Sequence, residues 1–556
     1  MLFTFADQRS PMALCLLLLT ISSRNCCSAF QFTVLRAMDV KKIAVIFVLS
    51  CCLWAVNGIW LARDTQAPAW DMALHQSYAL NYLPGADQGL GSRFWEKSGT
   101  YPPFVHTVIA VAYWFFHSGP HVAILANVPA TVLLLWGVYE MGLAFAGTRA
   151  AVWACILTTL TPFLIWISRE TLLDYWLAAW VAAALALLVK TSGFESRRYS
   201  FLLGLACALG MLTKWFFGGF LVGPMVYIVV RHQIWSSTRR TINCLVTTAI
   251  AVAGAGIWYA PNFSKLFRYY FENAHIGARE GEPPVFSFQS FIYYLRLLEG
   301  YQFFALLFCL FFLSIVFVYK NRILKGGGFL AVAIVGGWLA MTLLRTKDPR
   351  FTMPLLGPMN VVTAAWIQTW RRGWISGVIQ AVLLILLCTQ AYAINFGVRW
   401  LPRQVVLLKG YQGQLRWDWN LYLQEYFGIL GPPKREDWKQ DAILRRVSDD
   451  SSGRLLRTML ALIPDLPRFN ATNFNLFARL RDLPVEAGHP QSALEGIHSF
   501  EGFNYVVLIE GDQGWAYTTT ENLKLNSIVL THSQTFHFLD SYPLPDGAVA
   551  RLYAIR

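Results

Sequence analysis

The placement of the sequence FVHTVIAVAYWFFH, residues 104–117, determines the predicted membrane topology of the rest of the chain. It is strongly apolar but only fourteen residues long, with His106 near one end and His117 at the other. A helix that crosses a bilayer needs about 20 apolar residues, so this run is short for a span. Whether it crosses the membrane or lies on its surface sets the side of every later loop.

The composition of the whole chain indicates a membrane protein. Of its 556 residues, 56% are hydrophobic and only 14% are charged. Soluble domains have about 25% charged residues, so we expect the bilayer to be the solvent for most of this chain. The net charge of +14 comes from Lys and Arg that stand mostly as pairs between apolar runs. That pattern is typical of topology signals, and we expect no nucleic-acid partner.

Eleven longer apolar runs are candidates for membrane-spanning helices, since each approaches the length needed to cross. Their residue ranges are 43–62, 122–145, 150–167, 175–190, 200–216, 218–230, 243–260, 301–319, 327–344, 351–369 and 374–394.

The positive-inside rule places the short run 104–117. Lys41 and Lys42 precede the first candidate span, so that span should end outside the cytoplasm. If residues 104–117 do not cross, every later compact basic cluster falls inside, from Arg149 onward. If they cross, those clusters move outside. The sequence therefore predicts a helix lying at the outer interface, and eleven spans that leave the chain outside at about residue 395.

Three segments follow from this topology. We assign no function to residues 1–37, a signal-like segment or an upstream start before Met38. Residues 38–394 should form the transmembrane domain. Residues 395–556 are more polar, mix helix-like stretches with the strand-like YVVLIEG at 505–511, and should form an extracytoplasmic α/β domain. The predicted fold class is an all-α polytopic membrane protein with this C-terminal α/β domain.

Polar and ionisable residues gather at the predicted outer ends of the helices. Some have simple structural explanations: Asp71 and His75 could be a cap and a surface pair, Lys214 could reach toward headgroups, and Arg169 could pair with Asp174 at a helix end. Their convergence on one side favours a functional site. The predicted set comprises Asp71, His75, Tyr101, Pro102, Arg169, Glu170, Asp174, Lys214, Arg279, Glu280, Lys347 and Arg350.

Such a set suits sugar transfer from a polyprenyl phosphate. An acceptor hydroxyl or amine loses a proton as it attacks the anomeric carbon, and Asp71 can take that proton. The departing phosphate needs positioned cations, which Lys214 and Arg350 among others can supply. The chain has no Gly-rich phosphate loop, and its inner loops are too short for a nucleotide-binding domain. These features favour a lipid-borne donor over a nucleotide sugar.

At these residues the chain resembles glycosyltransferase family 39 of the GT-C superfamily, which contains protein O-mannosyltransferases and lipid A aminoarabinose transferases. The matching stretches are PAWDMALH (68–75), TYPPF (100–104), SRETLLDYWL (168–177), LGMLTKWFF (209–217), NAHIGAREGEPPVFS (273–287), KDPRFTMPLLGP (347–358) and SYPLPDGAVARLY (541–553).

The resemblance implies roles for single residues. Asp71 matches the catalytic base of the family, and Lys214 matches a lysine near the donor phosphate. Asp174 and Arg169 match the second acidic and basic positions of the cavity. Tyr101 with Pro102 matches the entrance of the outer interfacial helix. The family resemblance also implies an inverting transfer by direct displacement.

One departure from the family concerns a metal. Many members have Asp-Glu where this chain has Asp71-Met72, so a second carboxylate beside the base is missing. We therefore expect no cofactor and no metal ligands, although a divalent ion is still compatible with the sequence. The expected partners are a polyprenyl-phosphate-linked sugar donor, a lipid, glycan or protein acceptor, and the bilayer of a bacterial inner membrane.

Two other functions stay open at this stage. A transporter or flippase of lipid-linked sugars would show internal repeats and charges near the bilayer midplane. The chain shows no convincing repeat between its halves, and its charges fall near helix ends. A non-catalytic assembly protein, whose outer domain binds a partner, is the third hypothesis, because a fold does not determine a function.

Overall fold

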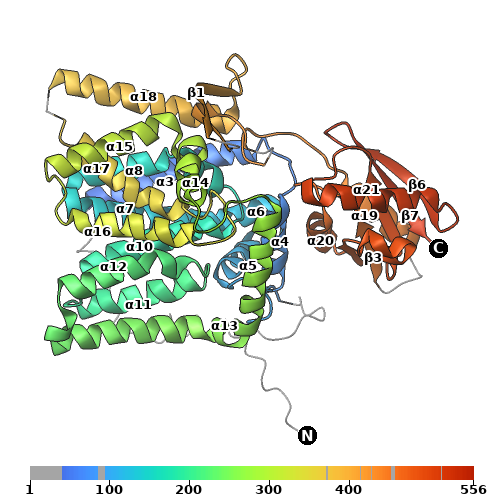
Figure 1. Cartoon of the computed structure of the whole chain (residues 1–556), viewed down its shortest axis with the longest axis horizontal. Helices are drawn as coiled ribbons and strands as arrows, with labels where there is room; N and C mark the ends of the chain where they lie inside the picture. Colours follow the sequence, from blue (N-terminus) through green and yellow to red (C-terminus); the bar gives the residue numbers. More distant parts are fainter. Residues whose placement is uncertain are drawn as a thin grey trace, which may run out of the picture. The chain divides into compact units, whose positions relative to one another are not determined.

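A computed structural model describes residues 40–84, 94–370, 373–412, 415–426, 429–451, 457–514 and 516–556 (Figure 1). The chain divides into two compact units, residues 1–48 and 49–556, and the second unit holds every residue of the predicted site. The N-terminal segment 1–37 lies outside the described residues. The predicted domain boundary at residue 395 stays a prediction.

Each of the eleven predicted spans coincides with helical structure, because long apolar runs form helices that satisfy their own backbone groups. These helices are α3 (Val40–Leu61), α7 (Val128–Ala146), α8 (Thr148–Thr159) with α9 (Pro162–Ser168), α10 (Leu173–Lys190), α11 (Arg197–Met211), α12 (Phe217–Arg231), α13 (Thr238–Arg279), α15 (Phe304–Lys320), α16 (Gly327–Thr342), α17 (Leu356–Ile367) and α18 (Trp374–Phe396).

Length and composition single out fewer helices as complete spans. Six helical segments of the described chain are long and apolar enough to cross a membrane, and there are seven if the pair α8 and α9, bent by 62°, counts as one. The chain is therefore a multi-pass membrane protein, as predicted. The count of eleven spans stays a prediction.

Helix α10 lies at the centre of the helical bundle and packs against α7, α11 and α12 (Figure 1). It is rich in alanine, and fifteen of its 18 residues are buried. Small residues let its backbone approach α7, where a Cβ on Gly137 would stand only 2.5 Å from the backbone of Ala182. This closely packed helix carries Asp174 in its first turn, so the carboxylate has a rigid support.

Shorter helices join the spans on the side of the predicted site. The run 104–117 forms a 13-residue helix, α5 (Phe104–Phe116), directly after the buried Pro102 and Pro103. Its place on the outer surface stays a prediction. The other short helices are α4 (Trp70–Leu80), α6 (Pro120–Ile124) and α14 (Phe288–Leu297), which continues through the π-helix Leu298–Phe303 into α15.

After α18 the chain enters strands. An antiparallel hairpin, β1 (Gln404–Gln412) with β2 (Leu415–Leu423), precedes a five-stranded sheet of order β4-β3-β5-β7-β6. In this sheet β3 is parallel to β4 and β5, whereas β7 is antiparallel to β5 and β6. The remaining elements are α19 (Gln440–Ser451), β3 (Thr458–Leu462), α20 (Ala471–Leu480), β4 (Val485–Gly488), β5 (Tyr505–Ile509), α21 (Ala516–Thr531), β6 (Phe536–Pro543) and β7 (Val549–Ile555).

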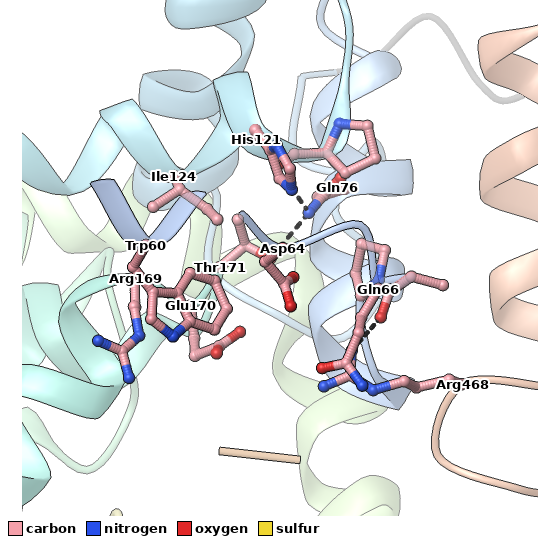
Figure 2. Close-up of a pocket in the computed structure, with 13 residues that line it drawn as sticks. Trp60, Asp64, Gln66, Gln76, His121, Ile124, Arg169, Glu170, Thr171 and Arg468 are labelled. Atoms are coloured by element: carbon pink, nitrogen blue, oxygen red, sulfur yellow. Dashed lines mark hydrogen bonds between the residues drawn. The ribbon is translucent and has the colours of Figure 1, made fainter. Parts of the chain in front are cut away.

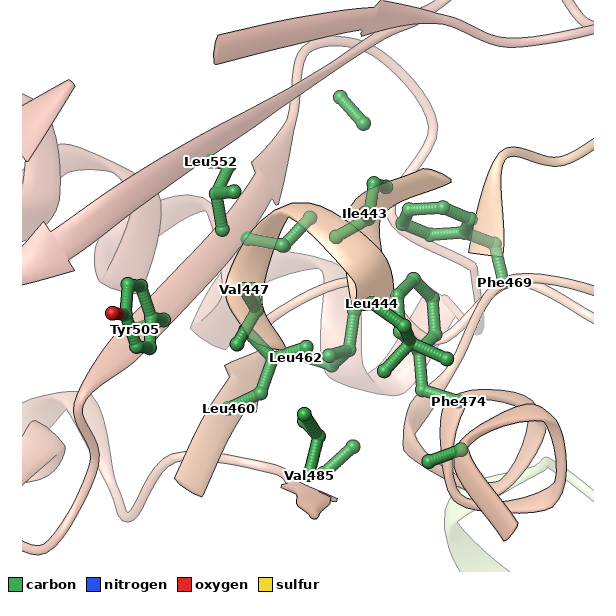
Figure 3. Packing of buried hydrophobic residues seen from close by; sticks show 14 of the residues in the cluster. Ile443, Leu444, Val447, Leu460, Leu462, Phe469, Phe474, Val485, Tyr505 and Leu552 are labelled. Atoms are coloured by element: carbon green, nitrogen blue, oxygen red, sulfur yellow. The ribbon is translucent and has the colours of Figure 1, made fainter. Parts of the chain in front are cut away.

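The five-stranded sheet has apolar residues buried on both faces, which confirms a small α/β domain at the C-terminus. All five residues of β5, the predicted strand YVVLI, are buried. On one face, Leu460 and Leu462 meet Leu444 of α19 in the cluster shown in Figure 3. Neighbouring residues of the same strands point to the other face, since side chains alternate along a strand.

Candidate active site

Asp71 lies in the first turn of α4, and its side chain is 42% exposed. The guanidinium of Arg350 donates from Nη1 to Asp71 Oδ2 at 3.3 Å. Asp348 holds the same guanidinium from the other side, because its Oδ2 accepts from Nη2 at 2.7 Å and from Nε at 2.9 Å. Burial disfavours the charge of Arg350, but Asp348 and Asp71 outweigh it and raise the pKa of the guanidinium. Arg350 therefore stays charged beside Asp71.

Asp174 and Lys214 form a second ion pair at the same site. Lys214 Nζ donates to Asp174 Oδ1 at 2.7 Å, and the side chains of Lys214 and Asp174 are only 9% and 2% exposed, respectively. The ammonium also lies 5.2 Å from the ring centres of Phe216 and Phe351. Phe351 directly follows Arg350 in the chain, and Asp174 also helps to raise the pKa of Arg350. The two ion pairs therefore form one cluster, built from α4, α10, the end of α11 and the turn after α16.

Aromatic side chains and histidines border this cluster. The rings of His75 and Tyr101 pack edge-on, with 4.8 Å between their centres. The Tyr101 hydroxyl lies 3.1 Å from the hydroxyl of Tyr269 on α13. Nδ1 of His75 lies 3.0 Å from Nε2 of His106. Burial, with the charges of Lys214 and Arg350, lowers the pKa of His75 to about 3. His75 is therefore neutral, and the charges of Lys214 and Arg350 oppose its protonation.

The ammonium of Lys347 binds the end of helix α16. Its Nζ donates to the carbonyls of Thr342 and Leu344, both at 2.6 Å, so it caps the last turn of α16. Burial lowers the pKa of Lys347 to about 8. Glu280 is exposed, and the pKa of its carboxyl is raised by partial burial and by Asp348. The side chain of Arg279 lies outside the described residues.

Arg169 and Glu170 belong to a separate buried cluster (Figure 2). The guanidinium carbon of Arg169 lies 4.4 Å from the ring centre of Trp60, and Nη1 donates to Asn395 Oδ1. Asp174 pairs with Lys214 instead, so the suggested ion pair between Arg169 and Asp174 is wrong. Burial raises the pKa of Glu170 to about 8. The cavity beside these residues has a volume of about 30 Å³, which suits water and is too small for a sugar.

The C-terminal domain holds helix α4 at both ends. Trp70 Nε1 donates to Asp465 Oδ1 at 2.9 Å, and Arg479 Nη1 donates to the carbonyl of Ser77 at 2.6 Å. Two further contacts hold the residues just before α4, since Arg468 donates to the carbonyl of Ala67 and Asn473 to that of Pro68. These contacts, 395 to 405 residues apart in sequence, set the position of the helix that carries Asp71.

Replacing Trp70 with phenylalanine should loosen this attachment. The ring remains, but Asp465 loses the donor to its partly buried carboxylate, so we expect about 1–2 kcal/mol less stability. The midpoint of thermal unfolding, followed by intrinsic fluorescence in detergent, measures the loss. Trp114→Phe is the control, because Trp114 is 57% exposed. An equal effect of both changes would show that the bond to Asp465 does not matter.

Acidification should destabilise the protein through the two buried histidines. The pKa of His75 falls from 6.5 to about 3 on folding, and burial lowers that of His106 as well. The folded state therefore binds fewer protons, and stability is lost as the pH falls below about 6.5, by about 1.4 kcal/mol per pH unit for each histidine. Unfolding midpoints between pH 7 and pH 5 should fall less steeply for His75→Gln. An equal dependence of the unfolding midpoint on pH in the wild type and in His75→Gln would contradict this prediction.

The structure thus unites Asp71, His75, Tyr101, Asp174, Lys214 and Arg350, and Pro102 starts the neighbouring helix. Two contributors are absent from the predicted set. Asp348 anchors Arg350, and Tyr269 contacts Tyr101 from a helix with many similar aromatic residues. Within the described residues, no group of three or more His, Cys, Asp or Glu side chains is placed to hold a metal ion.

Comparisons with known proteins agree with this fold. Residues 100–258 match the family model described as dolichyl-phosphate-mannose-protein mannosyltransferase. The undecaprenyl phosphate-alpha-4-amino-4-deoxy-L-arabinose arabinosyl transferase of Edwardsiella ictaluri (strain 93-146) is 27% identical over 302 residues, which are 50% of this chain and 51% of that protein. The chain therefore matches about half the length of this relative.

Solved structures show the same architecture. The crystal structure of ArnT from Cupriavidus metallidurans bound to undecaprenyl phosphate aligns with a TM-score of 0.55 and 11% identity, over 93% of this chain and 98% of that one. The apo oligosaccharyltransferase of Archaeoglobus fulgidus aligns with a TM-score of 0.50 and 11% identity, over 84% of this chain and 69% of that one. The family match, the relative from Edwardsiella and these structures together confirm the resemblance to the GT-C glycosyltransferases, and the structures confirm the predicted fold class.

Proposed function

We propose that this chain, which has the fold of the GT-C glycosyltransferases, transfers a sugar from a polyprenyl-phosphate donor to an acceptor outside the cytoplasm. The observation that carries the proposal is the cluster of Asp71, Arg350, Asp174 and Lys214. It combines one accessible carboxylate with two positioned cations, which is what attack on a sugar phosphate requires. The cluster lies at helix ends, where the headgroup of a lipid-linked donor would arrive.

Accessibility separates the two carboxylates. Asp71 is 42% exposed and meets Arg350 through a single contact of 3.3 Å, so an acceptor hydroxyl or amine can reach it. Asp174 is buried and bound to Lys214 at 2.7 Å. We therefore assign the general base to Asp71, which takes the proton of the acceptor as its oxygen or nitrogen attacks the anomeric carbon. Asp174 holds Lys214 in place.

The cations suit the leaving phosphate. Arg350 is held by Asp348 through two contacts below 3 Å, so its guanidinium is already oriented when the donor binds. Lys214 carries three donors and uses one on Asp174, so a phosphate oxygen can share the ammonium. One base and one cationic phosphate site are sufficient for a single direct displacement. We therefore infer that the sugar is transferred with inversion, and none of these roles uses a metal ion.

The relatives support a lipid-linked donor. The relative from Edwardsiella is named for an undecaprenyl phosphate sugar, and the ArnT structure contains undecaprenyl phosphate. We infer the same class of donor here, with a lipid, glycan or protein as acceptor. We also infer a bacterial inner membrane, with the cluster and residues 395–556 outside. A topology reporter fused after Ile394 should be active only outside the cytoplasm.

Reconstitution tests the proposal directly. The full chain in proteoliposomes should transfer radiolabel from an undecaprenyl-phosphate sugar to lipid A, glycan or peptide acceptors. A nucleotide sugar offered at the same concentration should give no transfer. Transfer from the nucleotide sugar alone would overturn the lipid-borne donor. Passage of the labelled lipid across the bilayer without transfer would favour a flippase.

A further inference from the structure

Four side chains lie along one face of helix α4 and its extension. Asp71, His75, Tyr78 and Tyr82 are spaced by four, three and four residues, which places them above one another on a helix. The chain segment 94–106 stands opposite this row. Gly99, with φ of +60°, lets that segment approach closely, because a Cβ there would stand 2.6 Å from the Tyr78 hydroxyl.

A continuous run of hydrogen bonds joins the row to the opposite segment. Nδ1 of His75 lies 3.0 Å from Nε2 of His106, and Nδ1 of His106 lies 2.8 Å from the hydroxyl of Ser98. That hydroxyl lies 2.6 Å from the Tyr82 hydroxyl, which contacts the carbonyl of Phe94 at 3.3 Å. We refer to these five residues as the histidine chain.

The Phe94 carbonyl sets the direction of every bond in the histidine chain, because a carbonyl can only accept. Tyr82 therefore donates to Phe94, and its oxygen accepts from the hydroxyl of Ser98. Ser98 in turn accepts from Nδ1–H of His106. A neutral His106 then has a bare Nε2, which accepts from Nδ1–H of His75. The opposite direction would leave the contact between Tyr82 and Phe94 unmade.

This direction leaves Nε2 of His75 without a proton. His75 is 3% exposed, and its Nε2 has no hydrogen-bond partner among the described residues. Lys214 and Arg350 are the charged groups that act on the ring, and both oppose its protonation. Other nearby groups are the aromatic ring of Tyr101 and the neutral His106. The ring therefore presents a neutral acceptor one helical turn from Asp71.

We propose that Nε2 of His75 accepts a hydrogen bond from a hydroxyl of the bound sugar substrate, and that the histidine chain fixes the required tautomer from as far away as Tyr82. The identity of the ligand rests on the proposed function, whereas the tautomer does not. The sugar donor and the acceptor substrate both carry hydroxyls, and measurements of KM for each substrate distinguish them.

The tautomer is tested without activity. Nitrogen NMR of the full chain labelled with [15N]histidine in nanodiscs should show His75 protonated at Nδ1 and bare at Nε2, assigned by the signal lost in His75→Gln. Tyr82→Phe should reverse this tautomer, since the Ser98 hydroxyl then turns to donate to His106. Tyr113→Phe is the control, because that hydroxyl donates to Gln76 at 3.1 Å instead. A protonated Nε2 in the wild type, or no change in Tyr82→Phe, would overturn the proposal.

The role of the acceptor nitrogen is tested by two amides of different reach. Asparagine places its amide near Nδ1, whereas glutamine can place a carbonyl oxygen near Nε2. We expect His75→Asn to raise KM about tenfold for the substrate that carries the hydroxyl, and His75→Gln to stay within about twofold. A rise for the donor alone, or for the acceptor alone, identifies the source of the hydroxyl.

Unchanged KM for both substrates in His75→Asn would overturn the role in binding. Affinity for undecaprenyl phosphate without sugar should be the same in the wild type and His75→Asn, because Lys214 and Arg350 hold the phosphate; a loss of that affinity would make His75 a phosphate ligand and overturn the proposal. If the wild type transfers no sugar, the proposed function fails, and the NMR result still decides the tautomer.

Discussion

Asp71→Asn should lower kcat for sugar transfer by about 10²–10⁴-fold, the usual contribution of a general base. Asparagine has the same shape, and its carbonyl oxygen can still accept from Arg350, which now lies 3.3 Å from Asp71. What it loses is the ability to take a proton from the acceptor. We therefore expect KM for the lipid-linked donor to stay within about twofold. Initial rates with a radiolabelled undecaprenyl-phosphate sugar measure both constants.

The matched control is Asp441→Asn, the same chemical change at a carboxylate that pairs with Arg481 on the exterior. It should leave kcat unchanged. Asp71→Glu should retain part of the activity, since the carboxylate is present but displaced by one methylene. Full turnover in Asp71→Asn would remove Asp71 as the base and would leave the cluster with a binding role only.

Much of the fold was predictable from the sequence, because the hydropathy pattern that specifies a helix lies within the sequence of that helix itself. Each apolar run such as 175–190 became a helix, and the apolar, β-branched run in YVVLIEG became the central strand β5. The number of complete spans was not predictable in the same way. Runs such as 150–167 break at Pro162, and the two halves bend by 62°, so length along the sequence overstates reach across the membrane.

The candidate site was only partly predictable, because side-chain direction in a loop cannot be read from spacing. Arg169 and Asp174 are five residues apart, yet one stacks on Trp60 while the other pairs with Lys214. That Lys347 binds substrate stays a prediction; in the structure its ammonium donates to two carbonyls at the end of α16, which the sequence did not indicate. The last carbonyls of a helix have no partner within the helix, so at a buried helix end they compete with substrate for a basic side chain that follows.

Contacts between distant segments left no signal in the sequence. His75 and His106 are 31 residues apart, and nothing in their surroundings indicates that they share a hydrogen bond. Arg468 reaches the carbonyl of Ala67 across 401 residues. The sequence therefore predicted which residues could do the chemistry, while the position of Asp71, the proposed base, depends on contacts with the C-terminal domain.

Breaking the buried pair of Asp174 and Lys214 should cost both stability and activity, and the two losses can be separated. Lys214→Met leaves the Asp174 carboxylate, 2% exposed, without its partner. Removing one member of a buried pair costs about 3–5 kcal/mol, so the free energy of unfolding should fall by that amount. Arg481→Met is the control, because that pair is largely exposed and should cost less than about 1 kcal/mol.

The double variant Lys214→Met with Asp174→Leu separates the two effects. Well-packed apolar residues can replace a buried ion pair with little loss, so most of the stability should return. Sugar transfer should stay at least about 100-fold below the wild type, because the phosphate has lost one of its two cations. Unfolding in denaturant and initial transfer rates measure the two quantities on the same preparation. If transfer returns together with stability, Lys214 only maintains the fold, and Arg350 alone supplies the positive charge for the departing phosphate.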